Sequence, residues 1–158
     1  NIGNFDTLKT AQLVHNKWHF KKFCLDNDIP TPKGFYFKDN LNPKDLNFPI
    51  VVKPTNLSGG RGIKIVTNQF ELNNALQKAQ ALSDDVFLEE FIEGRLIAYS
   101  VFLRNQKIIY AFSGADDTYL NKYLITTAYP IILDKEVKQK LKININKIAI
   151  LFCGSEAL

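Results

Sequence analysis

The sequence predicts an α+β fold with a mostly antiparallel sheet. Apolar residues recur at helical spacing near both ends of the chain, whereas short β-branched runs between turns fill its middle. Within that middle, Arg104-Asn105-Gln106 separates two strand-like runs, 97–103 and 107–112, as in a hairpin. Apolar residues make up 46% of the 158 residues, which is enough for a packed core.

Residues 4–27 are predicted to be helical, because their apolar positions follow helical spacing. Asn16 is placed to cap a helix that carries Trp18 to Leu25. The prolines of Ile29-Pro30-Thr31-Pro32 end this helix, since a residue before proline is pushed out of the helical region.

The remaining helices and strands are predicted from the same two patterns, apolar residues at helical spacing and short β-branched runs between turns. A helix over 69–82 carries an apolar stripe made of Phe70, Leu72, Ala75, Leu76, Ala79 and Leu82. Strands are expected over 34–37, 48–54, 63–66, 86–91 and 119–128, loops over 38–48 and 55–62, and a last helix over 134–152.

The strongest local motif is Lys53 with the loop that follows it. Lys53 ends an apolar strand, where an unpaired lysine is costly to bury and a phosphate would satisfy it. Glycines in a loop let backbone amides approach an anion closely. No helix opens after this loop, so it is neither a Walker P-loop nor a Rossmann turn, and a flexible hairpin turn is the alternative. The loop contains Ser58, Gly59, Gly60, Arg61 and Gly62.

Two further candidates lie on either side of this motif. Lys17, on a largely apolar helix, is either a phosphate ligand or a lysine whose ammonium extends to solvent. Glu89, Glu90, Phe91 and Ile92 follow an apolar strand. An extended backbone there would present hydrogen-bonding groups to an adenine edge, with two apolar side chains beside it. A strand that runs into an acidic turn is the alternative.

The order and spacing of these motifs resemble the ATP-grasp superfamily, to which biotin carboxylase, the carbamoyl-phosphate synthase large subunit and D-alanine–D-alanine ligase belong. The similarity extends over about residues 16–113. It implies that Lys17 contacts phosphate and that Lys53 bridges the α-phosphate and the adenine edge. It also implies that Ser58 to Gly62 form a mobile flap over the β- and γ-phosphates. The Glu90 carbonyl and the Ile92 amide would form hydrogen bonds with the adenine edge, while Glu89 and Phe91 would shape the pocket.

The resemblance also implies a reaction. ATP with Mg²⁺ would activate a small carboxylate substrate as an acyl-phosphate, which an amine then attacks. The expected subgroup is similar to carbamoyl-phosphate synthase or biotin carboxylase. The sequence departs from the pattern where many relatives hold the ribose with an acid, because Leu96 takes that place. The magnesium carboxylates are expected beyond the C-terminus of this chain, and neither Glu156 nor any other residue is assigned as a metal ligand or catalytic group.

The chain is expected to be one nucleotide-binding region, 1–158, with three parts. These are lead-in helices and a loop over 1–47, a flap subdomain over 48–94, and the start of a truncated C-terminal lobe over 95–158. The absence of Met and the apolar helical end before Cys153-Gly154 predict a piece of a longer enzyme that is inactive by itself.

Two other functions stay open on the sequence alone. One is a regulatory ATP-binding module that has lost its metal site. The other is a basic nucleic-acid-binding domain, with Phe102, Tyr110 and Phe112 beside Lys107 on one sheet face. The net charge is +4, and the basic residues form no clustered patch in the sequence, which argues against nucleic acid as a partner.

Cys24 and Cys153 match no metal or disulfide spacing, and both are expected to be buried in a reducing compartment. No apolar run is long enough to span a membrane. We therefore expect no membrane partner and a cytoplasmic location.

Overall fold

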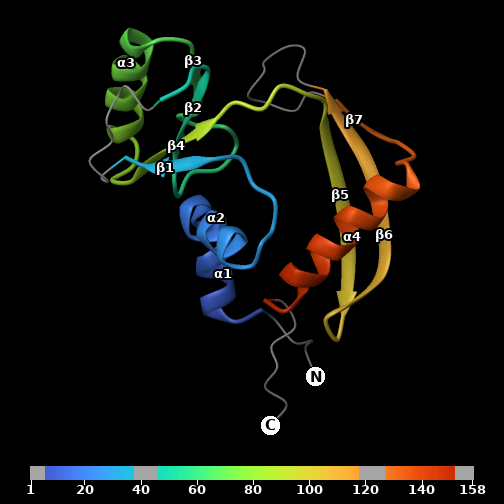
Figure 1. The fold of residues 1–158 in the computed structure, drawn as a ribbon. Helices are drawn as coiled ribbons and strands as arrows, with labels where there is room; N and C mark the ends of the chain where they lie inside the picture. Colours follow the sequence, from blue (N-terminus) through green and yellow to red (C-terminus); the bar gives the residue numbers. More distant parts are fainter. Residues whose placement is uncertain (1–5, 38–45, 118–126, 152–158) are drawn as a thin grey trace.

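The computed structural model describes residues 6–37, 46–117 and 127–151 (Figure 1). These residues form two antiparallel sheets, of strand order β1-β4-β2-β3 and β5-β6-β7, with four helices, which confirms the predicted α+β class. The elements are α1 (Leu8–His15), α2 (Lys17–Asp26), β1 (Gly34–Tyr36), β2 (Ile50–Pro54), β3 (Lys64–Val66), α3 (Gln69–Gln80), β4 (Val86–Glu90), β5 (Leu96–Arg104), β6 (Lys107–Asp117), β7 (Thr127–Pro130) and α4 (Lys135–Ala149).

The first sheet has one apolar face and one mixed face, because successive side chains of a strand alternate. Ile50 and Val52 of β2 share a face with Val86 and Leu88 of β4, and α3 covers that face to form the main core. The opposite face carries Val51, Lys53, Phe87 and Glu89 in the same register. Lys53 is therefore placed by simple alternation on the face away from α3.

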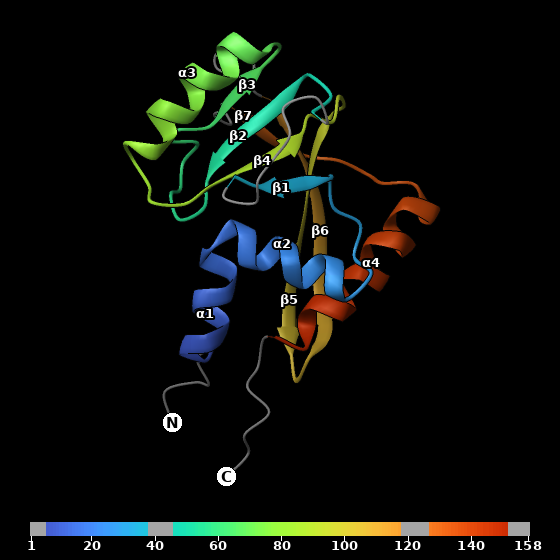
Figure 2. The ribbon, with the colours of Figure 1, turned by 60° about the vertical axis from the view of Figure 1, so that its left-hand side comes forward.

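Helix α2 lies against this mixed face (Figure 2). The Trp18 ring stacks on Tyr36 at a centroid distance of 5.3 Å and contacts Phe87 at 5.8 Å. Aromatic pairs at such distances add to the stabilisation that burial of their surface provides. The packing fixes the first turn of α2, and with it Lys17, beside the ends of β1 and β4.

The helical region predicted over 4–27 consists of two helices, α1 and α2, which meet at Asn16. The chain is extended at Asn16, with φ −89° and ψ 111°, and the Asn16 side chain accepts hydrogen bonds from the amides of Trp18 and His19, both at 3.0 Å. The predicted cap is thus confirmed. The break has a distant cause, since the Lys17 amide donates to the Thr55 carbonyl at 2.8 Å instead of continuing α1.

The apolar stripe predicted for α3 is too wide. Leu72, Ala75, Leu76 and Ala79 are buried, as helical spacing requires. Phe70 is 77% exposed because it lies two positions before Leu72, on the other side of the helix. Leu82 is 55% exposed and follows the end of the helix.

The second sheet begins with the predicted hairpin. Asn105 and Gln106 both have positive φ, 49° and 59°, which is typical of a two-residue hairpin turn that matches strand twist. Strand β6 continues to Asp117, beyond its predicted end at 112, because it also pairs with β7. Most of the strand predicted over 119–128 lies outside the described residues. Helix α4 packs on β6, where Ala115 is fully buried.

Polar contacts hold α4 to the first helices. The Lys147 ammonium donates to the carbonyls of Asn27 and Asp28 at 2.9 and 2.8 Å. The Thr10 hydroxyl donates to the Leu151 carbonyl at 2.7 Å. Segments from the two ends of the chain therefore lie side by side, as both ribbon views show. None of the helices in the described part of the chain is long and apolar enough to cross a membrane.

Candidate functional site

A cavity of about 390 Å³ lies between α2, the turn after it and the mixed face of the first sheet. Its wall is largely apolar, with Phe20, Ile29 and Phe87 among the lining residues. Its charged lining residues are Lys17, Lys21, Lys53 and Glu89. Two positive charges in this cavity are therefore not balanced by a lining carboxylate, which favours an anionic ligand.

Glu89 is the centre of the charged cluster. Its side chain is 9% exposed, and its two carboxylate oxygens accept from different lysines. Lys21 donates to Oε1 at 2.7 Å, and Lys53 donates to Oε2. The pairing follows from register: Val51 is opposite Glu89 and Lys53 is opposite Phe87, so Lys53 and Glu89 are diagonal neighbours on one face.

Lys21 is a site residue that sequence reasoning missed. It is 4% exposed, and it also donates to the Thr31 hydroxyl at 3.0 Å and to the Pro32 carbonyl. The available signal was its spacing: Lys17 and Lys21 are four positions apart, so they share one face of α2. By contrast Lys22, the next residue, is exposed.

Lys17 connects α2 to the glycine-rich loop, because its ammonium donates to the Leu57 carbonyl. Burial lowers the pKa of Lys17 below the ordinary lysine value, and the nearby positive charge of Lys53 lowers it further. The two ammonium groups therefore repel each other across the cavity. An anion placed between them would relieve this repulsion and favour the charged form of Lys17.

The glycine-rich loop lies next to the cavity but does not line it. Turn hydrogen bonds run from the Arg61 amide to the Ser58 carbonyl at 3.4 Å and from the Ile63 amide to the Gly60 carbonyl at 3.2 Å. Positive φ angles of 64°, 72° and 73° occur at Gly59, Gly60 and Gly62, and glycine adopts such angles without steric cost. The predicted role of this loop as a mobile flap stays a prediction.

The segment after β4 is also outside the cavity. Strand β4 ends at Glu90, one residue earlier than predicted, and Glu90 pairs twice with Lys33: its amide donates to the Lys33 carbonyl at 2.9 Å and its carboxylate accepts from the Lys33 amide at 2.7 Å. Phe91 and Ile92 are 37% and 61% exposed. The structure thus brings Lys17, Lys53 and Glu89 together, whereas adenine recognition by the Glu90 carbonyl and the Ile92 amide stays a prediction.

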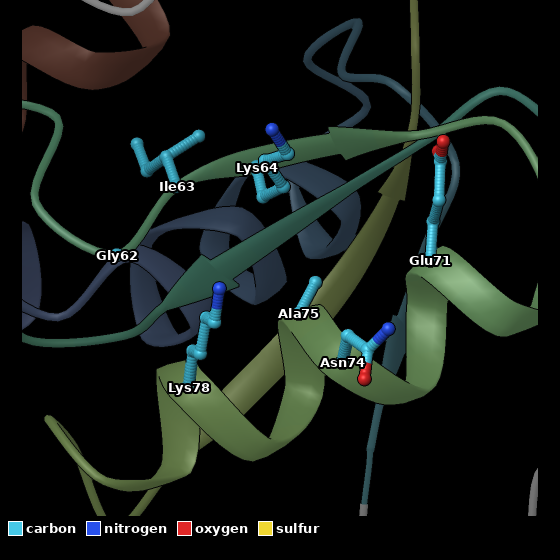
Figure 3. Close-up of a pocket in the computed structure, with 7 residues that line it drawn as sticks. All are labelled: Gly62, Ile63, Lys64, Glu71, Asn74, Ala75 and Lys78. Carbon is cyan, nitrogen blue, oxygen red and sulfur yellow. The ribbon is translucent and has the colours of Figure 1, made fainter.

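A second hollow, of about 350 Å³, lies between β3 and α3 (Figure 3). Lys64 and Lys78 are at its edge, with Glu71 and Asn74 from the same helix as Lys78, and Gly62 is the one predicted site residue that lines it. It is open to the α3 side of the first sheet, away from Lys53 and Glu89. The two hollows therefore have no lining residue in common.

The described residues do not fit a magnesium site. No group of three or more His, Cys, Asp or Glu side chains within 6–37, 46–117 and 127–151 is arranged to hold a metal ion. Glu89 is held by two lysines, so its oxygens are already paired with cations.

The exposed row of aromatic side chains predicted on the hairpin is present. Phe102, Tyr110 and Phe112 are 58%, 60% and 48% exposed, and neighbouring ring centroids are 6.0 and 6.2 Å apart. Lys135, Lys138, Lys140 and Lys142 of α4 are also exposed, whereas Lys147 is partly buried. The candidate residues Lys17, Lys53 and Glu89 line the charged cavity and are not part of this aromatic row.

The two antiparallel sheets and their helices have the fold of the ATP-grasp ligases. The structure superposes on the D-alanine–D-alanine ligase of Bacillus anthracis with a TM-score of 0.75 and 25% identity, covering 94% of this chain and 52% of that one. An L-amino acid ligase from Bacillus licheniformis shares the fold, with a TM-score of 0.69 and 22% identity, over 90% of this chain and 35% of that one.

The family model described as D-ala D-ala ligase C-terminus matches residues 37–153, and the chain belongs to this family. The D-alanine–D-alanine ligase of Prochlorococcus marinus is 32% identical over 114 residues, which cover 70% of this chain and 32% of the relative. The phosphoribosylamine–glycine ligase of Pyrococcus abyssi is 32% identical over 112 residues, 65% of this chain and 26% of the relative. The chain spans about a quarter to a third of the length of these relatives.

These matches refine the expected subgroup. The ATP-grasp assignment made from the motifs is confirmed. Within that superfamily the matches indicate the branch of the D-alanine–D-alanine ligases, to which carbamoyl-phosphate synthase is a more distant relative.

Proposed function

We propose that this chain forms the nucleotide-binding part of an ATP-dependent ligase that joins a carboxylate to an amine. The observation that carries this proposal is the cavity that gathers Lys17, Lys21, Lys53 and Glu89, with two positive charges that no lining carboxylate balances. A polyphosphate supplies the missing negative charge, and charge-assisted hydrogen bonds from lysine to phosphate are strong.

The chain's own residues would bind and orient the nucleotide. Lys17 and Lys53 lie at the end of the cavity next to the glycine-rich loop, so their ammonium groups would hold phosphate oxygens. Backbone amides of residues 58–62 would cover the outer phosphates and exclude water. The chain after Glu90 would contact the adenine. ATP in this class of reaction supplies the phosphoryl group that activates the carboxylate.

For the whole protein we propose D-alanine as the substrate that supplies both the carboxylate and the amine. The matching family and the relative from Prochlorococcus marinus both carry that name. A structural relative from Bacillus anthracis is described as complexed with ATP, and it shares this fold at a TM-score of 0.72. The magnesium that such ligases use would be held by residues outside the described part of this chain.

Calorimetry on the 158-residue chain tests the first half of this proposal. We expect affinity to rise from adenosine to ADP, because the phosphates meet Lys17 and Lys53. A folded chain that binds neither ADP nor ATP at millimolar concentration would contradict nucleotide binding.

Phosphate release by the whole protein tests the second half. We expect ATP hydrolysis that depends on D-alanine and not on L-alanine or glycine. Nucleotide binding without substrate-dependent phosphate release, across a panel of amino acids, would favour the regulatory ATP-binding module.

A further inference from the structure

Lys21 and Lys53 hold the two oxygens of one carboxylate, Glu89, but they do so in different ways. The Lys21 side chain is 3% exposed, and its ammonium has three acceptors: Glu89, the Thr31 hydroxyl and the Pro32 carbonyl. An ammonium group has three protons, so each has a partner. The Lys53 side chain is 25% exposed, and among the described residues its hydrogen-bond acceptor is Glu89.

We propose that Lys21 is a positioning residue that keeps Glu89 paired when Lys53 leaves it to bind phosphate. This inference rests on the proposed nucleotide-binding function. A buried carboxylate without a counter-ion is strongly unfavourable, so Lys53 alone could not leave Glu89 without a large cost. With Lys21 fixed on the other oxygen, Glu89 keeps one cation while Lys53 exchanges a carboxylate for a phosphate.

The surroundings of Lys21 keep its ammonium in place. A Cβ at Gly34 would lie 2.2 Å from Cε and 2.9 Å from Cδ of Lys21. The Lys21 side chain therefore occupies space that is available only because β1 has a glycine at this position. Gly34 is also directly opposite Glu89 in the sheet. Lys21 is therefore enclosed by β1 and by the turn at Thr31 and Pro32, whereas Lys53, which lines the same cavity, has a side chain that is 25% exposed.

The test compares ADP with adenosine, because the difference between their affinities isolates the contribution of the phosphates. Dissociation constants are measured by calorimetry for the 158-residue chain and for Lys21→Met, with Lys22→Met as the matched control on the same helix. We expect Lys21→Met to weaken ADP binding about tenfold or more, since one charge-assisted phosphate contact is lost, and to change adenosine binding much less. Lys22→Met should match the unmodified chain.

A double variant separates positioning from simple structural support. Glu89→Gln removes the charge that retains Lys53, so Lys21→Met combined with Glu89→Gln should recover the ADP affinity of Glu89→Gln alone. An equal loss of ADP and adenosine binding in Lys21→Met, without recovery in the double variant, would overturn the positioning role.

Failure of this inference can be told apart from failure of the proposed function. If the unmodified chain binds no ADP, the nucleotide-binding proposal fails. If it binds ADP and Lys21→Met behaves as Lys22→Met does, only the role of Lys21 is overturned. Should Lys21→Met not fold, the double variant decides: we expect it to fold and to bind ADP as Glu89→Gln does, and a folded double variant that has lost ADP binding contradicts the role.

Discussion

Lys53 on β2 and Glu89 on β4 form an ion pair across the face of the first sheet against which α2 packs. The two strands are antiparallel neighbours, and the pair joins residues 36 positions apart in the sequence. A phosphate that enters the cavity must therefore compete with a carboxylate for the Lys53 ammonium. The strength of nucleotide binding then depends on an exchange of ionic partners and not on capture by an unpaired lysine.

Replacing Lys53 should weaken nucleotide binding more than replacing Lys64. Lys53 lines the charged cavity, whereas Lys64 is exposed on β3 and borders the hollow on the other side of the sheet. A charge-assisted hydrogen bond contributes about 1.5–3 kcal/mol, so Lys53→Ala should raise the dissociation constant of ADP by about tenfold or more. Calorimetry on both variants measures this difference. Equal affinities for the two would mean that the phosphates are bound elsewhere.

Gly62 should tolerate replacement by alanine less well than Gly59. It has φ 73°, and an added Cβ would lie 2.7 Å from Cγ of Pro54, a residue of the buried strand β2. Gly59 also has positive φ, 64°, but nothing lies within 4 Å of its added Cβ. In both variants alanine must adopt a positive φ, which costs about 1–2 kcal/mol of stability. Gly62→Ala also brings the added Cβ into steric conflict with Pro54.

Urea unfolding measures the free energies of unfolding of these two variants. We expect Gly62→Ala to lower the midpoint more than Gly59→Ala. Matching midpoints would show that Pro54 moves aside without cost.

The loop over 58–61 should become ordered when nucleotide binds. Ser58, Gly59 and Arg61 are exposed, and the loop's own turn hydrogen bond, from the Arg61 amide to the Ser58 carbonyl, is long at 3.4 Å. Few contacts oppose its opening, so its amides should exchange rapidly in the free chain and more slowly with saturating ATP. Hydrogen exchange read residue by residue on the seconds-to-minutes timescale gives the result, with buried Leu76 of α3 as the internal reference. Unchanged exchange at 58–61 in the presence of bound ATP would count against closure of a flap.

The sequence was most informative where a local rule decides the structure. The apolar run before Lys53 predicted a buried strand that ends in a charge in need of a partner, and the cap at Asn16 was predicted from its residue type. The hairpin at Asn105 and Gln106 was likewise predicted from its length and flanking strands. In each case the pattern that carries the prediction lies within a few positions of the residue concerned.

The interactions that the sequence did not predict are all long-range. The partner of Lys53 depends on the register between β2 and β4, which no local pattern determines. Lys21 and its exposed neighbour Lys22 are the same residue type in the same helix. The spacing from Lys17 separates them, but the burial of Lys21 and its contact with Glu89 follow from the packing of α2 on the sheet. The end of α1 depends on the Thr55 carbonyl, which lies 38 residues beyond Lys17 and accepts its amide. These features require the tertiary structure.

The last prediction concerns pH and begins with Lys17. Its pKa is lowered from the ordinary value of 10.5, first by burial and then by the positive charge of Lys53. In the unfolded chain Lys17 keeps its proton up to the ordinary value. Between the lowered pKa and 10.5 the unfolded state therefore binds more protons, so this residue makes the free energy of unfolding rise with pH across that window. Below the window both states are protonated, and the contribution of Lys17 no longer varies with pH.

Nucleotide binding should have the opposite dependence on pH. Phosphate binds the charged ammonium and raises its pKa again, so ADP binding in the same window should take up protons and should weaken as the pH rises. Calorimetry in two buffers of different ionisation enthalpy measures the proton uptake, and the Lys17→Met variant shows how much of it belongs to this residue. We expect the Lys17→Met variant to bind ADP more weakly than the unmodified chain at neutral pH. We also expect its ADP affinity to fall much less steeply as the pH rises through this window. A decline of the same steepness in both proteins would assign the titration to another group and would leave Lys17 without a part in phosphate binding.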